Sequence, residues 1–122
     1  MATDNEHERQ AAHNREFLDS IDKTKHADWV ATVAFYTAVH RVQALFHLSR
    51  DRCKSHRERN RILRRKFPQI WKHYHPLYSL SRLARYWCMK VHPRDVPKIL
   101  YRLGEFDREV DRQIAKHRKR SP

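Results

Sequence analysis

The segment HADWVATVAFYTAVHRVQALFHLSR, residues 26–50, decides the fold class of this 122-residue chain. When the segment is wound as an α-helix, apolar side chains occupy almost every face of it. That pattern is typical of a helix buried on all sides. At 1.5 Å per residue such a helix would be about 37 Å long. The sequence therefore predicts a central helix over residues 26–50 with other helices packed around it.

The composition also favours an all-α fold. The whole chain contains one glycine, Gly104, whereas sheets joined by tight hairpins usually need glycine at positive φ. The same scarcity excludes glycine-rich phosphate-binding loops. A chain of this length fits one domain that can bury a core without disulfides or metals. We therefore expect a single helical domain over residues 1–122, a compact bundle of four to five helices.

Capping residues mark where two further helices begin. Residues 4–23 predict a peripheral first helix, with Thr3 or Asp4 as its N-cap. Ser55 and Glu58 have the spacing of a capping box, in which each side chain accepts a hydrogen bond from the backbone of the other. A short basic third helix should therefore begin at this serine.

Prolines mark the boundaries of the remaining helices. Pro68 should stop the third helix. A fourth helix is expected over 69–92, with Pro76 either kinking it or lying in its first turn. Apolar residues at intervals of three and four predict a fifth helix over 95–117. The basic segment 117–122 is expected to be a disordered tail.

The formal net charge is +13 at neutral pH, which favours polyanions such as RNA, DNA or an anionic membrane surface, and of these RNA is the expected partner. No apolar run reaches the ~18 residues needed to span a membrane, so no membrane association is predicted. The opening MATDNEHERQ is polar, unlike a secretory signal. Cys53 and Cys88 form no C-x-x-C motif, and two reduced thiols fit a cytoplasmic protein.

The third helix carries the densest run of basic residues. We expect these side chains to hold an RNA backbone, although a solvated helix face would have the same composition. They are Arg57, Arg59, Arg61, Arg64, Arg65 and Lys66. Contacts of this kind position a nucleic acid without reading its sequence.

A chain with ten histidines could bind a metal ion if their spacing matched a known ligand pattern. There is no H-E-x-x-H motif, and no pair of E-x-x-H motifs that could build a di-iron bundle. His73 and His75 are two residues apart, which places them on different faces of a helix. The sequence therefore predicts neither a metal site nor a cofactor.

Polar residues interrupt two helical stripes that are expected to face the core. On the central helix, His40 follows Trp29, Val33 and Tyr36 in one stripe. It could be a core histidine that bonds to a tyrosine or a backbone carbonyl, or part of a polar pocket. On the fourth helix, Arg85 shares a stripe with tyrosine and serine, and an inward-facing arginine is unfavourable unless it is paired.

Residues 26–90 contain a tryptophan, an F-Y-x-A-x-H helix, an S-H-x-x-R turn and a Y-x-x-L-x-x-x-S-x-x-A-R-Y helix. The residues of these motifs are Trp29, Phe35, Tyr36, Ala38, His40, Ser55, His56, Arg59, Tyr74, Leu77, Ser81, Ala84, Arg85 and Tyr86. In these motifs the chain resembles a group of small HEPN-domain proteins (higher eukaryotes and prokaryotes nucleotide-binding).

The resemblance implies a helical bundle that forms a homodimer and acts as a metal-independent endoribonuclease in toxin or anti-phage defence systems. It also implies an antitoxin or another defence-system protein as a partner. The family hallmark is an arginine followed by four to six residues and a histidine, before the last helix. Arg85 and His92 match that spacing and that place, which makes them the implied catalytic pair. The tyrosine after Arg85 and the proline after His92 depart from the usual pattern.

Spacing alone does not single out this pair. Four Arg-x4–6-His matches occur, and chance placement would give about four. Arg85 and His92 are distinguished by their position before the final helix. A histidine can exchange protons near neutral pH, and an arginine can grip phosphate oxygens bidentately, so RNA cleavage would need no metal.

The alternative is a non-catalytic HEPN-like module that binds RNA, a nucleotide or a partner protein through a polar pocket. Besides Arg85, the residues expected to line this pocket are Tyr36, His40, His56, Arg59, Tyr74, Ser81 and Tyr86. A purely structural helical subunit is a third interpretation.

Overall fold

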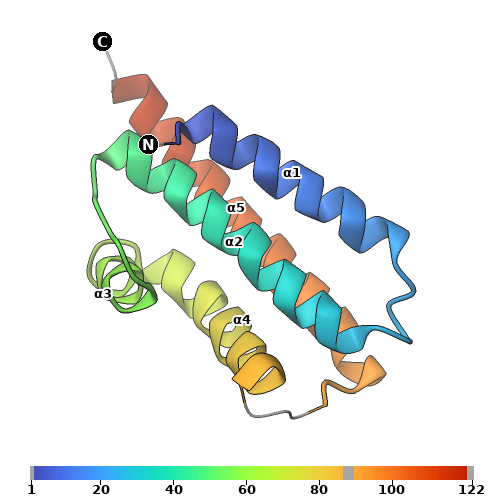
Figure 1. Cartoon of the computed structure of the whole chain (residues 1–122). Helices are drawn as coiled ribbons and strands as arrows, with labels where there is room; N and C mark the ends of the chain where they lie inside the picture. The colour runs from blue at the N-terminus through green and yellow to red at the C-terminus, as the bar shows by residue number, and fades with distance from the viewer. Residues whose placement is uncertain (1, 87–89, 121–122) are drawn as a thin grey trace.

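The computed structural model describes residues 2–86 and 90–120 and confirms the all-α bundle (Figure 1). The helices in chain order are α1 (Asp4–Ser20), α2 (Ala27–Ser49), α3 (His56–Lys66), α4 (Pro68–Tyr86), a short 3₁₀-helix η1 (Pro93–Asp95) and α5 (Val96–Arg120). None of the helices in the described ranges is long and apolar enough to cross a membrane.

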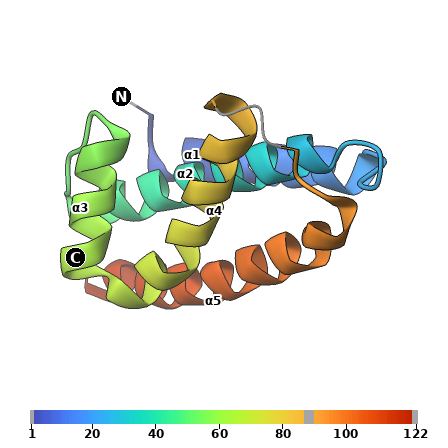
Figure 2. The ribbon, with the colours of Figure 1, turned by 90° about the horizontal axis from the view of Figure 1, so that it is seen from below.

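Helix α2 is the centre of the bundle, as its sequence predicts. Helices α1, α4 and α5 all pack against it, and α3 packs against α4. Helices α1 and α5 run alongside α2, so that the two chain ends lie at the same end of the bundle (Figure 1). Seen from below, α3 lies at one end and α4 bridges from the level of α5 to that of α2 (Figure 2).

The core is built from the inward faces of α2 and α5. In α2 the residues with no exposed surface include Val30, Ala34, Phe35, Ala38, Val42 and Leu45. The buried stripe of α5 is Val96, Ile99, Leu103, Phe106, Val110 and Ile114. This stripe confirms the three-four spacing that predicted the fifth helix.

Helices α1 and α3 begin at the capping residues that the sequence predicts. Thr3 is the N-cap of α1: its Oγ1 accepts the Glu6 amide at 3.1 Å, and the Glu6 carboxylate accepts the Thr3 amide at 3.4 Å. Ser55 caps α3 through the Glu58 amide, at 3.1 Å. The Glu58 carboxylate, however, accepts from the amide of Lys54 at 2.9 Å, so the predicted capping box is only half formed.

Helix α1 ends at Ser20, which corrects the expected range of 4–23. The chain turns there because side chains compete for the backbone groups that would continue the helix. The Ser20 hydroxyl donates to the Phe17 carbonyl at 2.8 Å. The Asp22 carboxylate accepts from the amides of Thr24 and Lys25, both at 3.1 Å.

The fourth helix is shorter than predicted, and the expected range of 69–92 is wrong at its end. Helix α4 ends at Tyr86 within the described residues, and residues 90–92 are not helical. His92 precedes Pro93 and has extended backbone angles (φ −79°, ψ 144°), as the clash with a following proline ring requires. Arg85 and His92 therefore do not share a helix face. Pro76 lies inside α4, which begins at Pro68.

Helix α5 continues further than expected, through the beginning of the basic segment that was expected to be a disordered tail. Residues 117–120 belong to the helix, and residues 121–122 lie outside the described part of the chain. Two contacts hold this end on the bundle. Arg118 Nη2 donates to an Asp4 carboxylate oxygen at 3.3 Å, and the ring of His117 meets the ring of Phe67 at 6.3 Å between centroids.

Candidate nucleic-acid interface

The stretch from Arg59 to Arg94 contains ten lysine and arginine residues and no aspartate or glutamate. Helix α4 lies wholly within this stretch, together with most of α3. The positive charges of this stretch can therefore be neutralised only by carboxylates from elsewhere in the fold or by a bound anion. The contacts of three arginines on these two helices decide between these possibilities.

Arg59 is a buried cation, with 7% of its surface exposed. Its Nη1 donates to Nδ1 of His56 at 2.8 Å, and its Nε has no hydrogen-bond partner among the described residues. No carboxylate in residues 2–86 and 90–120 forms an ion pair with it. The expectation that Arg59 belongs to an exposed basic face is therefore wrong.

The other basic residues of α3 that were expected to hold RNA are on the surface. Arg57, Arg61, Arg64, Arg65 and Lys66 are all exposed. Two of them have contacts within the chain. Lys66 pairs with Asp51 at 2.7 Å, and the Arg64 guanidinium lies 5.8 Å from the centre of the Trp71 ring. Arg57, Arg61 and Arg65 are thus the more available cations of this helix.

Arg85 is held by a tyrosine hydroxyl and aromatic faces instead of a carboxylate. Its Nη1 donates to the hydroxyl of Tyr36, and its Nε donates to the carbonyl of Ser81 at 3.4 Å. The guanidinium lies 5.1 Å from the ring centres of both Tyr36 and Tyr86. Such contacts hold the charge in place without neutralising it.

Arg82 has the same kind of surroundings. Its Nη1 donates to the Tyr78 hydroxyl at 3.1 Å, and its guanidinium lies 5.7 Å from the ring centres of Tyr78 and Tyr86. We call this arrangement the guanidinium–tyrosine cluster. Its members are Tyr36, His56, Arg59, Tyr78, Arg82, Arg85 and Tyr86.

The ring of Phe35 anchors the cluster to the core. This fully buried ring lies 5.5 Å from Tyr36 and 5.6 Å from both His56 and Tyr78, between centroids. Three aromatic members of the cluster, Tyr36 from α2, His56 from α3 and Tyr78 from α4, therefore lie around this one ring of the central helix. The cluster is therefore built on rigid helices rather than on loops.

His56 has a defined tautomer. A guanidinium can only donate hydrogen bonds, so Nδ1 of His56 must accept from Arg59, and the ring proton lies on Nε2. Burial lowers the pKa of His56 below its ordinary value, and the charges of Arg59, Arg85 and Arg82 lower it further. At neutral pH His56 is therefore an uncharged N–H donor beside three cations.

His40 is paired with a histidine and not with a tyrosine or backbone carbonyl. Its Nδ1 lies 3.0 Å from Nδ1 of His7, which places it under α1. Burial lowers the pKa of both rings, and Arg59 contributes to both shifts. The prediction that the stripe of Trp29, Tyr36 and His40 faces the core is wrong, since the side chains of Trp29 and Tyr36 are 55% and 36% exposed.

The other predicted pocket residues lie in the interior. Tyr74 and Ser81 are fully buried, and their hydroxyls have no hydrogen-bond partner in the described part of the chain. Burial raises the pKa of the Tyr74 phenol, and the nearby Arg59 charge partly opposes that shift. The expected pocket therefore divides: Tyr36, His56, Arg59 and Tyr86 join the cluster, and the two buried hydroxyls lie in the core.

His92 is exposed and caps η1. Its Nδ1 accepts the amide of Arg94 at 3.0 Å, and its own amide donates to the Asp95 carboxylate at 3.2 Å. Within the described residues no hydrogen bond, ion pair or ring contact joins His92 to Arg85. Residues 87–89, which include Cys88, lie outside the described part of the chain between them.

Five arginines on α1, α2 and α5 have carboxylate partners, unlike the three arginines of the cluster. The carboxylates that pair with them come from α1 and α5. The pairs are Arg15–Asp107, Arg41–Glu8, Arg41–Asp107, Arg41–Asp111, Arg108–Glu105, Arg112–Glu109 and Arg118–Asp4. The carboxylates of these pairs neutralise arginines on the α1–α5 side of the bundle, whereas no carboxylate among the described residues pairs with an arginine of α3 or α4.

Groups of three or more histidine, cysteine or acidic side chains that could hold a metal ion do not occur in residues 2–86 and 90–120. Cys53 is a free thiol that lies 3.6 Å from the side-chain nitrogen of Gln43.

Comparisons with protein-family models, with curated proteins and with solved structures found no match for this chain.

Proposed function

We propose that this protein binds single-stranded RNA through the guanidinium–tyrosine cluster. The observation that carries the proposal is that Arg59, Arg82 and Arg85 have no carboxylate partner among the described residues, although five other arginines do. Guanidinium groups of this kind can grip phosphate oxygens bidentately. The net charge of +13 adds a long-range attraction for polyanions.

The tyrosines of the cluster supply the preference for single strands. Tyr86 is 65% exposed and Tyr36 is 36% exposed, and both rings lie against Arg85. Unpaired bases can stack on such rings, whereas the bases of a duplex are already stacked on each other. Positive groups beside exposed aromatic rings are the combination used to bind single-stranded nucleic acid without reading its sequence.

The test is a fluorescence-anisotropy titration of a labelled single-stranded RNA with the Arg82→Gln/Arg85→Gln variant. The matched control is Arg108→Gln/Arg112→Gln, which removes the same charge from two surface arginines that pair with glutamates. We expect about a tenfold or greater loss of affinity in the cluster variant and little change in the control. The slope of log affinity against log salt should also become shallower by about 1.4 in the cluster variant alone, because two phosphate contacts to a single strand are lost. Equal losses in the two variants would show that binding depends on net charge and not on the cluster.

A second candidate function is a metal-independent endoribonuclease of toxin or anti-phage defence type, with Arg85 and His92 as its catalytic pair. The observation that favours it is the tautomer of His92: Nδ1 accepts the Arg94 amide, so the proton of the neutral ring lies on Nε2. A protonated nitrogen on an exposed ring could donate to a leaving oxygen, while Arg85 holds the phosphate. Because no contact joins the two residues within the described chain, this candidate needs a symmetric dimer that completes the site. Cleavage of RNA in the presence of EDTA is the first test.

A further inference from the structure

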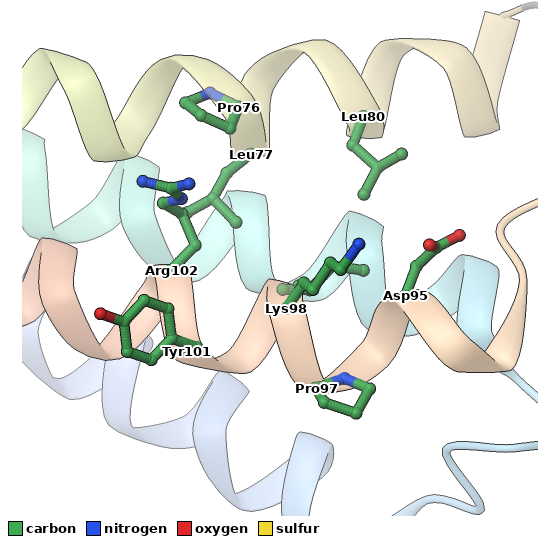
Figure 3. A pocket seen from close by; sticks show the side chains of 9 residues that line it. Pro76, Leu77, Leu80, Asp95, Pro97, Lys98, Tyr101 and Arg102 are labelled. Carbon is green, nitrogen blue, oxygen red and sulfur yellow. The ribbon is translucent and has the colours of Figure 1, made fainter.

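An open groove of about 550 Å³ lies between α4 and α5 (Figure 3). Its apolar part is formed by Leu77 and Ile99, which are buried, and by the half-buried Leu80. Prolines and a tyrosine continue the apolar surface at the rim. The other residues that line the groove are Pro76, Asp95, Pro97, Lys98, Tyr101 and Arg102.

Two cations extend over this apolar surface. Lys98 and Arg102 lie four residues apart on α5, and both side chains extend from α5 toward α4 (Figure 3). In the described residues Lys98 has no ion pair, and Arg102 meets Nδ1 of His73 at 3.3 Å but no carboxylate. Among the described residues that line the groove, Asp95 is the only acidic one, and one of its oxygens already accepts the His92 amide.

We propose that this groove is the docking site for an acidic amphipathic helix of a partner protein. Apolar side chains at i, i+3, i+4 and i+7 would enter the groove, as in other helix-in-groove complexes. Two acidic residues one turn apart on that helix would face Lys98 and Arg102, whose positions are about 6 Å apart along α5. A second copy of this chain is the weaker candidate for this groove, because a molecule with a net charge of +13 offers no excess of acidic side chains to face these two cations.

The proposal rests on a different surface from the guanidinium–tyrosine cluster and can be tested separately. The probe is a labelled helical peptide with leucines at i, i+3, i+4 and i+7 and glutamates one turn apart beside them. We expect Lys98→Glu/Arg102→Glu to weaken its binding about tenfold or more, because like charges then face each other. The matched control is Arg112→Glu/Lys116→Glu, a pair of exposed cations with the same spacing on the same helix. That control should bind the peptide nearly as well as the unaltered protein.

Two altered peptides separate specific docking from general charge attraction. A peptide with lysines in place of the glutamates should bind the Lys98→Glu/Arg102→Glu variant better than the unaltered protein. A peptide that keeps the glutamates but has serines in place of the leucines should bind about tenfold more weakly. Equal loss of binding in both charge-reversed pairs, or equal binding of the leucine and serine peptides, would overturn the proposal. An RNA oligonucleotide that loses affinity in Lys98→Glu/Arg102→Glu but not in the control would also overturn it.

Discussion

Arg41 and Arg59 are buried to nearly the same extent, at 8% and 7% exposure, but their electrostatic surroundings are opposite. Arg41 donates to three carboxylates, at distances of 2.6 to 3.2 Å, from Glu8, Asp107 and Asp111. Arg59 meets no carboxylate within the described residues. A buried charge without a counter-charge is destabilising, so an arginine kept in that state is typical of a binding site.

This contrast predicts opposite effects of the same substitution. We expect Arg41→Met to lower the free energy of unfolding by about 2 kcal/mol, because three carboxylates lose their shared cation. Arg59→Met should leave that free energy unchanged or raise it by up to about 1 kcal/mol, because a buried, uncompensated charge is removed. Urea denaturation measures both changes. Strong destabilisation by Arg59→Met would assign Arg59 a structural role.

Arg59→Met also gives a test of function that a loss of stability cannot explain. If the cluster binds RNA, this variant should bind single-stranded RNA about tenfold more weakly while melting at the same temperature or higher. The measurement is anisotropy beside thermal melting on the same preparation. Unchanged affinity would remove Arg59 from the interface.

The stability should fall as the pH falls below neutrality. Burial lowers the pKa of His7, His40 and His56, so the folded state binds protons less readily than the unfolded state, whose histidines titrate near 6.5. The stabilising effect of a lowered histidine pKa is complete above the unfolded value and is lost as the pH falls through the window below it. We expect the melting temperature to drop between about pH 7.5 and about pH 5.5. His40→Gln should reduce this dependence, and a melting temperature that is flat or rises on acidification would contradict the account.

The ribonuclease candidate can be tested with His92→Asn, a substitution that keeps the cap of η1. Because Nδ1 of His92 caps η1, His92→Ala should lower stability by about 1 kcal/mol, whereas an asparagine can still accept the Arg94 amide. If Arg85 and His92 are catalytic, both His92 variants and Arg85→Ala should abolish RNA cleavage, and EDTA should not affect the unaltered protein. An RNA-cleavage assay on gels measures this. A His92→Asn protein that cleaves RNA at the normal rate would eliminate the pair.

The features that the sequence predicts correctly depend on short-range or uniform signals. Residues 26–50 are apolar on nearly every face, and only burial at the centre of a bundle satisfies such a helix. Thr3 and Ser55 cap their helices through bonds to residues three positions away, which need no knowledge of the tertiary fold. The resemblance to HEPN-domain proteins selects five residues that the structure brings into one cluster, although no comparison supports the family itself.

The features that sequence reasoning missed depend on tertiary packing. A helix that is apolar all round has no unique inner face, so the exposure of Trp29 and the position of His40 under α1 were not predictable from periodicity. Arg82 was not among the predicted site residues. Two signals could have indicated it: Tyr78 lies one turn before it, and no acidic residue occurs between Arg59 and Arg94.

The claim that the guanidinium–tyrosine cluster binds single-stranded RNA is tested most directly by photochemical crosslinking at two tyrosines. Tyr86 and Tyr101 are equally exposed, at 65%, but Tyr86 lies against Arg82 and Arg85, whereas Tyr101 lines the groove between α4 and α5. After ultraviolet irradiation with a single-stranded RNA, mass spectrometry should find the crosslinked nucleotide on Tyr86 and not on Tyr101. Equal crosslinking of the two tyrosines, or a preference for Tyr101, would contradict the account.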